Sequence, residues 1–187
     1  MSINIQYFSQ FSKDHTYLII VLSKLNQLNN IKLPFEIKKI SKNKTLINRL
    51  NDSKYIEISI ESIELNIFID VVVILADDEN RSAIFLGSNL FDKFDKISQK
   101  DVTIIFSKKL LKNDLFCSNF IFGIFLKSYS FSKYKNNKSK FKINCINIFL
   151  DNNRKLKNIK KLNNLLQSIN FCKNLVSEPA NILNPVT

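Results

Sequence analysis

The residues best suited to chemistry are one histidine, His15, and one compact group of acids, Asp77, Asp78 and Glu79. Histidine is a common general base and metal ligand because it titrates near neutral pH. His15 precedes an apolar run and has no His or Cys partner at metal-ligand spacing, so we favour a strand-edge position over a catalytic role. The acids could bind a hard cation weakly, but a solvated turn is the simpler interpretation. The sequence therefore predicts no catalytic, cofactor-binding or metal-binding residue.

The chain has only 2 glycines, Gly87 and Gly123, and neither belongs to a glycine-rich loop. Phosphate cradles of nucleotide-binding proteins need clustered glycines, because the backbone must approach the phosphates closely. The sequence therefore predicts no such cradle and argues against ADP-ribose binding. A serine nucleophile cannot be selected either, because no base is available to activate one.

The composition describes a basic chain of 187 residues, long enough for one domain with a substantial core. Hydrophobic residues make up 45%, and 16 phenylalanines with no tryptophan indicate that phenylalanine fills most large core positions. The net charge of +12 suits a nucleic-acid or other anionic partner. Abundant Asn, Lys, Ile and Phe are also typical of a very AT-rich genome, and we favour that origin for the lysines.

Targeting and redox features predict a soluble, cytoplasmic protein. The first eleven residues alternate polar and apolar side chains instead of forming the apolar core of a signal peptide. The longest apolar run, residues 71–76, is far too short to cross a bilayer, so no membrane partner is expected. Cys117, Cys145 and Cys172 lie in apolar contexts without paired spacing, which predicts three buried thiols in a reducing compartment.

Apolar periodicity predicts alternating strands and helices. Strands are expected over residues 3–7, 17–22, 55–60, 68–75, 83–86, 102–106 and 143–150. Helices are expected from Pro34 to about residue 50, within residues 88–100, and through residues 115–125 with Asn113 or Asp114 as the cap. This order predicts an α/β layered fold with a mixed sheet flanked by helices.

Each glycine has its own expected place in this fold. The charged residues 77–81 should turn between hairpin-like strands at 68–75 and 83–86, and Gly87 should close the second strand. Gly123 lies inside a predicted helix, where glycine costs about 1 kcal/mol against alanine. We expect this glycine to allow close packing against a neighbouring strand.

A long helix is predicted near the end of the chain, with Asp151 or Asn152 as its cap. Its apolar residues follow three- and four-residue spacing: Leu156, Ile159, Leu162, Leu165, Leu166, Ile169, Cys172, Leu175 and Val176. Pro179 should end the helix near Val176 or Ser177. We expect an α/β domain over residues 1–152, a connector helix over 153–176 and a linker over 177–187. We also expect firm folding only through about Leu166, with residues 171–187 frayed and prone to self-association.

The same segment resembles a known protein family. Residues 174–185 are Asn-Leu-Val-Ser-Glu-Pro-Ala-Asn-Ile-Leu-Asn-Pro. This resembles Asp-Leu-Val-Asn-Glu-Pro-Ala-Asn-Val-Leu-Thr-Pro at the domain junction of the leucyl (cytosol) aminopeptidases. Gly123, followed by Tyr129, Phe131, Tyr134 and Lys135, is similar to the family's Gly-x5-Tyr-x-Phe-x-x-Tyr-Lys segment. The resemblance is specific over residues 120–185 and weaker before them.

The resemblance implies a macro-domain-like sheet and a non-catalytic role. The family removes N-terminal amino acids from peptides with two divalent metals, manganese or zinc, held in a C-terminal peptidase domain. Metal-ligand motifs of that domain, such as Asn-Thr-Asp-Ala-Glu-Gly-Arg, are absent from this chain. The chain then corresponds to the N-terminal domain only, inactive as a hydrolase by itself. Its implied partners are the missing peptidase domain and, in full-length members, further copies in a homo-hexamer.

An alternative function comes from the basic and aromatic residues between 127 and 142. Their aromatic members are Tyr129, Phe131, Tyr134 and Phe141, and their basic members are Lys127, Lys133, Lys135, Lys138, Lys140 and Lys142. Stacking rings and phosphate-contacting lysines are typical of single-strand binding, so a basic module that contacts nucleic acid or another acidic partner remains open. The aromatic spacing matches the family's own segment, where it belongs to the fold, so we favour packing.

Overall fold

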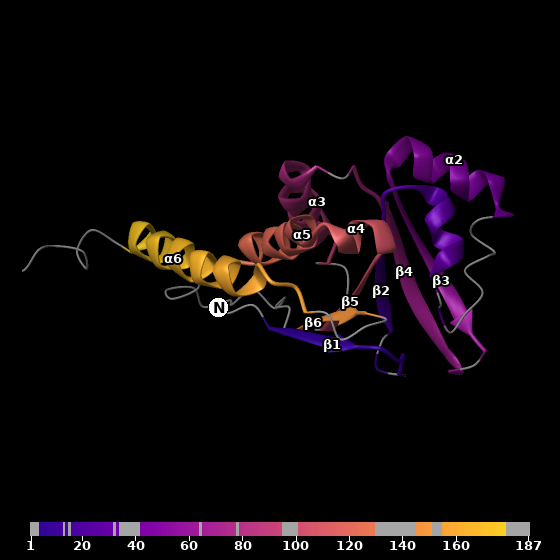
Figure 1. The fold of residues 1–187 in the computed structure, drawn as a ribbon, viewed down its shortest axis with the longest axis horizontal. Coiled ribbons are helices and arrows are strands. Elements are labelled where there is room, and N and C mark those ends of the chain that lie inside the picture. The colour runs from indigo at the N-terminus through magenta and orange to yellow at the C-terminus, as the bar shows by residue number, and fades with distance from the viewer. Residues whose placement is uncertain are drawn as a thin grey trace, which may run out of the picture.

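The computed structural model describes residues 4–12, 14, 16–31, 33, 42–63, 65–77, 79–94, 101–129, 145–150 and 155–178. Within them, one 6-stranded sheet has the order β1-β6-β5-β2-β4-β3 (Figure 1). Its strands are β1 (Ile5–Phe8), β2 (Tyr17–Leu22), β3 (Tyr55–Ser62), β4 (Ile67–Leu75), β5 (Asp101–Phe106) and β6 (Cys145–Phe149). Only the β3–β4 pair is antiparallel among the described strand pairs. The expected mixed sheet is confirmed.

Helices cover both faces of this sheet (Figure 1). On one face lie α3 (Asn80–Phe94), α4 (Lys108–Lys112), α5 (Asp114–Lys127) and α6 (Ile159–Ser177). The 3-10 helix η1 (Leu25–Asn30) and α2 (Lys44–Ser53) lie on the other face, where Leu28 and Leu50 are fully buried. The result is the predicted layered α/β fold, ending in a long helix.

The central strand is β2, which lies between β5 and β4. All 6 of its residues are buried, as its unbroken apolar run predicts for a strand covered on both faces. Phenylalanines from α5 then fill the space between sheet and helices: Phe116, Phe120 and Phe125 are among the largest fully buried side chains. The predicted phenylalanine core is confirmed.

The segment around residues 83–86 corrects one prediction. It lies inside α3 rather than in a strand, and the hairpin of the sheet is formed by β3 and β4. A short apolar run suits either structure, because local periodicity cannot separate a buried strand from a buried helix turn. Ala83, Gly87 and Leu90 are buried at four- and three-residue spacing, which is the helical period. Gly87 therefore lies in a helix interior and closes no strand.

Both glycines lie where α3 and α5 touch. A Cβ on Gly87 would lie 2.0 Å from the carbonyl oxygen of Phe120, and a Cβ on Gly123 would lie 2.1 Å from that of Ile84. The close approach expected of Gly123 is confirmed, but its neighbour is a helix and not a strand. The two glycines of the chain thus allow two helix backbones to pack directly against each other.

The long helix α6 begins at Ile159, later than expected, and its N-cap Asn158 makes no side-chain cap. Side chains from distant parts of the sequence accept hydrogen bonds from the backbone of the preceding turn. The Leu156 N–H donates to the Tyr7 hydroxyl (3.2 Å), and the Asp114 carboxylate accepts from the backbone N–H groups of Lys157 (2.8 Å) and Asn158 (3.1 Å). The end at Ser177 is confirmed, with extended backbone at the next residue.

Several predictions fall on residues outside the described ranges. These are the helix start at Pro34, the caps Asp151 and Asn152, the basic and aromatic residues beyond Tyr129, and the linker from residue 179 onward. The described part of the helix predicted from Pro34 is α2, whose N-cap is Asn43: its side chain accepts from the N–H groups of Thr45 and Leu46.

Candidate functional site

The apolar stripe of α6 divides into an inner and an outer part. Inner residues pack on the core: Leu166 is fully buried, and Ile159, Leu162 and Ile169 contact the same cluster. Other apolar residues of the helix remain in solvent, with exposed fractions of 47% for Leu165, 63% for Phe171, 41% for Leu175 and 86% for Val176. We call these four residues, with the exposed Cys172, the outer face of α6.

Polar contacts hold the second half of α6 on its own domain. The Tyr129 hydroxyl donates to Asn174 Oδ1 (2.8 Å), and Lys173 Nζ donates to the carbonyl oxygen of Leu126 (3.4 Å). Lys173 Nζ also lies 4.9 Å from the centre of the Tyr129 ring, which is a cation–π distance. The helix therefore continues beyond Leu166 to Ser177, and the fraying expected from residue 171 stays a prediction that hydrogen exchange would test.

Tyr129 is the aromatic member of the aromatic and basic segment that the structure describes, and Lys127 is its described basic member. The contacts of Tyr129 with Asn174 and Lys173 are packing contacts between the end of α5 and α6, as the structural interpretation predicted for this residue. Phe131, Tyr134 and Phe141 lie outside the described residues, and so do the lysines of residues 133–142. Tyr129 thus helps to orient the helix that carries the outer face.

The outer face has the chemistry of a contact surface. It carries aliphatic and aromatic side chains and one thiol, and burial of one large apolar side chain against a partner contributes about 1.5–3 kcal/mol. The apolar spacing predicts the stripe but not its division, because periodicity cannot tell which apolar residues the domain itself covers. Phe171 was not predicted, because it lies off the stripe and shows only as an extra aromatic residue in the last turns.

The cysteines correct a second prediction. Cys117 and Cys145 are buried free thiols as expected, but Cys172 is exposed on the outer face of α6. Its apolar sequence neighbours suggested burial, yet those neighbours are themselves partly in solvent. Burial raises the pKa of the Cys145 thiol, and Asp101 adds to that rise, so this thiol stays protonated at neutral pH.

The described residues contain no group of three or more His, Cys, Asp or Glu side chains that could hold a metal. Asp77 and Glu79 are exposed, as a solvated turn predicts, whereas Asp78 and His15 lie outside the described ranges. Nor does the described part include a helix long and apolar enough to cross a membrane.

A hollow of about 400 Å³ lies between α2 and β3. Its lining residues are Leu46, Arg49, Asp52, Ser53, Tyr55, Ile56 and Glu57. The Tyr55 hydroxyl donates to Glu57 Oε2 (3.2 Å), and burial together with Glu57 raises the pKa of Tyr55. Tyr55 therefore remains protonated and bonded to its neighbour, which leaves this lining without an activated nucleophile.

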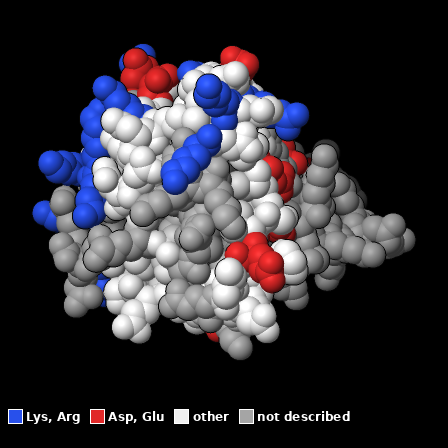
Figure 2. Space-filling model, turned by 90° about the vertical axis from the view of Figure 1, so that its right-hand side faces the viewer, with Lys and Arg blue, Asp and Glu red and all other residues white. Residues whose placement is uncertain are grey.

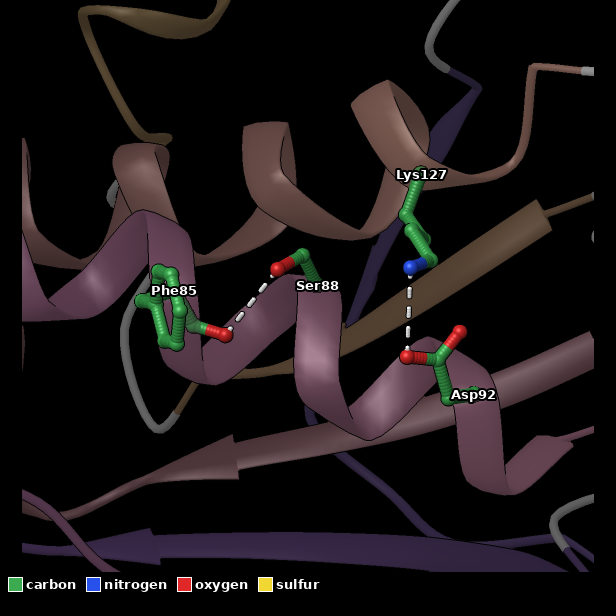
Figure 3. Close-up of polar contacts among 4 residues, drawn as sticks. All are labelled: Phe85, Ser88, Asp92 and Lys127. Carbon is green, nitrogen blue, oxygen red and sulfur yellow. Dashed lines mark hydrogen bonds and ion pairs between the residues drawn. The ribbon is translucent and has the colours of Figure 1, made fainter.

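One side of α3 carries the exposed aromatic residue Phe85, with 70% of its surface in solvent, near Ser88 and Asp92 (Figure 3). Ser88 Oγ donates to the Phe85 carbonyl oxygen (3.1 Å), and Lys127 Nζ lies 3.3 Å from Asp92 Oδ2. An exposed ion pair of this kind contributes at most about 1 kcal/mol. Isolated exposed apolar residues are normal on protein surfaces, so this side of α3 is a weaker candidate than α6.

Comparisons with known proteins find a likeness in structure but none in sequence. No protein-family model matches the sequence, and no curated protein matches it. Among solved structures, the chain is similar to a mutant of tomato leucine aminopeptidase, with 13% sequence identity and a TM-score of 0.59. The match covers 98% of this chain and 40% of that chain, so this chain spans well under half of that protein's length. This likeness shows a shared fold.

Proposed function

We propose that this chain is the N-terminal, non-catalytic domain of a leucyl-aminopeptidase-type protein and that it docks onto a peptidase domain through the outer face of α6. The shared fold covers nearly the whole of this chain but under half of the tomato protein. This supports a correspondence between this chain and one domain of such a protein. The junction-like residues 174–185 begin in the last turn of α6 and continue beyond it.

The observation that carries the proposal is the exposure of Phe171, Leu175 and Val176 in the last two turns of α6. These turns lead directly into the junction-like segment, so a following domain would be delivered to this end of the helix. Apolar side chains in solvent gain free energy when a partner covers them. A peptidase domain at this position would bury the outer face.

The two divalent metals of the family, manganese or zinc, do not fit the described residues of this chain. Two-metal hydrolysis needs several carboxylates and a nitrogen ligand converging on both ions. The described residues bring no three such groups together. We therefore assign metal binding and peptide hydrolysis to the partner domain and no catalytic step to this chain.

Cellular location and assembly are part of the proposal. Three free cysteines, Cys117, Cys145 and Cys172, are typical of a reducing compartment, which supports a cytoplasmic location. The resemblance extends to homo-hexamers, whose contacts are made largely by the peptidase domain. By itself, this chain should instead self-associate weakly through the outer face of α6.

A genomic observation tests the proposal. We expect the source genome to encode a peptidase domain with a motif similar to Asn-Thr-Asp-Ala-Glu-Gly-Arg, either downstream of codon 187 or in a separate gene. The proposed docking needs such a partner. A complete genome without any such reading frame would overturn the proposal.

A further inference from the structure

The strand at one edge of the sheet is β3, which is 8 residues long and pairs only with β4 among the described strands. The pairing runs without a bulge from Tyr55 opposite Ile74 to Ser62 opposite Ile67. Natural proteins use bulges, prolines and lysines to protect edge strands from pairing with another chain. β3 contains no proline and no lysine, so none of these three devices protects it.

The register shows which backbone groups of β3 point away from β4. The Leu75 N–H donates to the Lys54 carbonyl oxygen (3.0 Å), one residue before β3 begins. In an antiparallel pair, residues that exchange backbone hydrogen bonds alternate with residues whose N–H and C=O groups point the other way. The outward groups of β3 therefore belong to every second residue from its start: Tyr55, Glu57, Ser59 and Glu61.

Ser53 satisfies the first of these outward positions. Its Oγ accepts from the Tyr55 N–H (3.3 Å) and donates to the Tyr55 carbonyl oxygen. The other three residues, Glu57, Ser59 and Glu61, are exposed. Their outward N–H and C=O groups are the ones that an added strand would use.

One side of β3 is apolar and adjoins the hollow of about 400 Å³ between α2 and β3. Ile56 is buried there with Leu50 of α2, and Leu46, Ile58 and Ile60 pack against the same cluster. The described lining of the hollow includes residues of β3 and none of β4, so the hollow lies on the outer side of β3. An apolar side chain of an added strand can fill it.

The other side of β3 is acidic. Glu57 and Glu61 are exposed there, and Asp70 of β4 lies opposite Ser59 between them. The chain has 28 basic and 16 acidic residues, yet β3 has two acids and no basic residue. Figure 2 shows the side of the molecule that carries α2 and β3 in Figure 1: Lys and Arg gather along the upper left, and acidic side chains also lie apart from them, lower on this face. A general excess of lysine therefore does not explain the charge of this edge.

This charge makes a second copy of β3 a poor partner. Antiparallel pairing of two copies about Ser59 would place Glu57 of each copy opposite Glu61 of the other. Like charges directly opposite each other destabilise a strand pair, whereas opposite charges stabilise it. The edge therefore favours a partner with basic side chains at these positions.

We propose that the outer edge of β3 binds an extended segment of another protein in which basic and apolar residues alternate. The backbone of this segment pairs with the outward groups of Glu57, Ser59 and Glu61. Successive side chains of a strand point to opposite faces, so its basic residues lie beside the carboxylates and its apolar residues lie on the α2 side. This site does not involve α6, and its test needs no peptidase domain, so it stands apart from the test of the proposed function.

The test is a fluorescence titration of a labelled peptide, acetyl-Lys-Ile-Lys-Phe-Lys-Ile-Lys-amide, with the full chain at about 0.15 M salt. A control peptide has glutamate in place of every lysine. The net charge of +12 repels the basic peptide and attracts the acidic one, so tighter binding of the basic peptide identifies the local charge of the edge. Bound peptide should also slow hydrogen exchange at the N–H groups of Glu57, Ser59 and Glu61.

Two pairs of variants separate backbone pairing from charge. Ser59→Pro removes one outward N–H without removing a hydrogen bond to β4, and its control Ser59→Ala removes the same hydroxyl but keeps the N–H. Glu57→Gln with Glu61→Gln removes two charges from the edge. Asp92→Asn with Asp101→Asn removes two charges from exposed acids elsewhere. Thermal unfolding verifies that the variants fold, and the exchange measurement tests backbone pairing even if Ser59→Pro does not.

We expect the wild-type chain to bind the basic peptide more tightly than the acidic one. Ser59→Pro and the double Glu variant should bind the basic peptide at least about tenfold more weakly, and both controls should bind as the wild type does. Absence of wild-type binding, equal binding of the two peptides, or unchanged exchange at the three N–H groups would overturn the proposal. Equal binding by Ser59→Pro and Ser59→Ala would do the same. Self-association of the chain that is lost in Ser59→Pro would assign the edge to a second copy instead.

Discussion

At the scale of single residues, the closest packing in the molecule depends on Gly87 and Gly123. A Cβ at either position would lie about 2 Å from a backbone carbonyl oxygen of the facing helix. A backbone oxygen cannot rotate out of the way as a flexible side chain can. Any larger residue must therefore push α3 and α5 apart and disturb the buried phenylalanines of α5, including Phe120.

We predict that Gly87→Ala and Gly123→Ala each lower the free energy of unfolding by about 1–3 kcal/mol or more through overpacking. This loss should outweigh the gain of about 1 kcal/mol that alanine brings to a helix interior. Urea denaturation measures both effects. Ser88→Ala, one residue after Gly87 in α3, is the control: it removes only a hydrogen bond to the Phe85 carbonyl oxygen of the same helix and should change stability little (Figure 3). A Gly87→Ala variant as stable as this control would show that the helices do not touch.

The position of Gly87 also shows what one sequence cannot give. As the end of a strand it would tolerate alanine, whereas in the α3–α5 contact it does not. The partner atoms are the carbonyl oxygens of residues 33 to 39 positions away in the chain (Gly87 to Phe120, and Gly123 to Ile84). No local pattern contains that information.

At the scale of elements, strands with long apolar runs could be predicted and the short ambiguous run could not. β2 and β5 were predicted closely because runs of six and five consecutive apolar or β-branched residues indicate a strand that is buried on both faces. β3 was predicted by its alternation. The strand predicted over residues 83–86 was wrong because four apolar residues fit both the strand period and the helix period. The charged residues before them suggested a turn instead of a helix start.

The start of α6 depends on Asp114, one of the two residues expected to cap α5. The other, Asn113, is the cap, since its Oδ1 accepts from the Phe116 N–H (3.1 Å). Asp114 instead accepts from Lys157 N–H, Asn158 N–H and Asn158 Nδ2, the last at 2.6 Å. One carboxylate thus joins the start of α5 to the turn before α6, over 43 and 44 positions of sequence.

We predict that Asp114→Ala lowers the free energy of unfolding by about 1.5–3 kcal/mol, the contribution expected of hydrogen bonds to a charged group. Denaturation measures the loss, and hydrogen exchange at Lys157 and Asn158 should become faster. Asp92→Ala is the control, because it removes only the exposed ion pair with Lys127. Equal stability of the two variants, with unchanged exchange before α6, would contradict the role given to Asp114.

At the scale of the whole molecule, α6 extends away from the sheet, so its C-terminal turns lie far from β3 at the sheet edge (Figure 1). The outer face of α6 and the outer edge of β3 are therefore separate surfaces on one scaffold. The sequence indicated the first through its stripe and its junction-like end. It gave no sign of the second, because the place of β3 at the edge depends on how distant segments pair in the sheet.

We predict that the purified chain does not hydrolyse leucine p-nitroanilide, with or without added manganese, zinc or cobalt. Two-metal hydrolysis needs a converging set of ligands, and the described residues bring no such set together. A colorimetric assay at neutral pH measures this directly. Metal-dependent turnover that persists after contaminating peptidases are removed would contradict a non-catalytic role.

The central claim is that the outer face of α6 docks a peptidase domain, and sedimentation of this chain with the peptidase half encoded in the same genome tests it most directly. We predict a complex with the wild-type chain and binding at least about tenfold weaker with Phe171→Ser, Leu175→Ser and Val176→Ser combined. Thermal stability should be retained, because these side chains are already in solvent. A control with Ile63→Ser and Phe68→Ser, exposed apolar residues at the β3–β4 turn, should bind as the wild type does. No complex with the wild-type chain, or equal binding by the α6 variant, would contradict the claim.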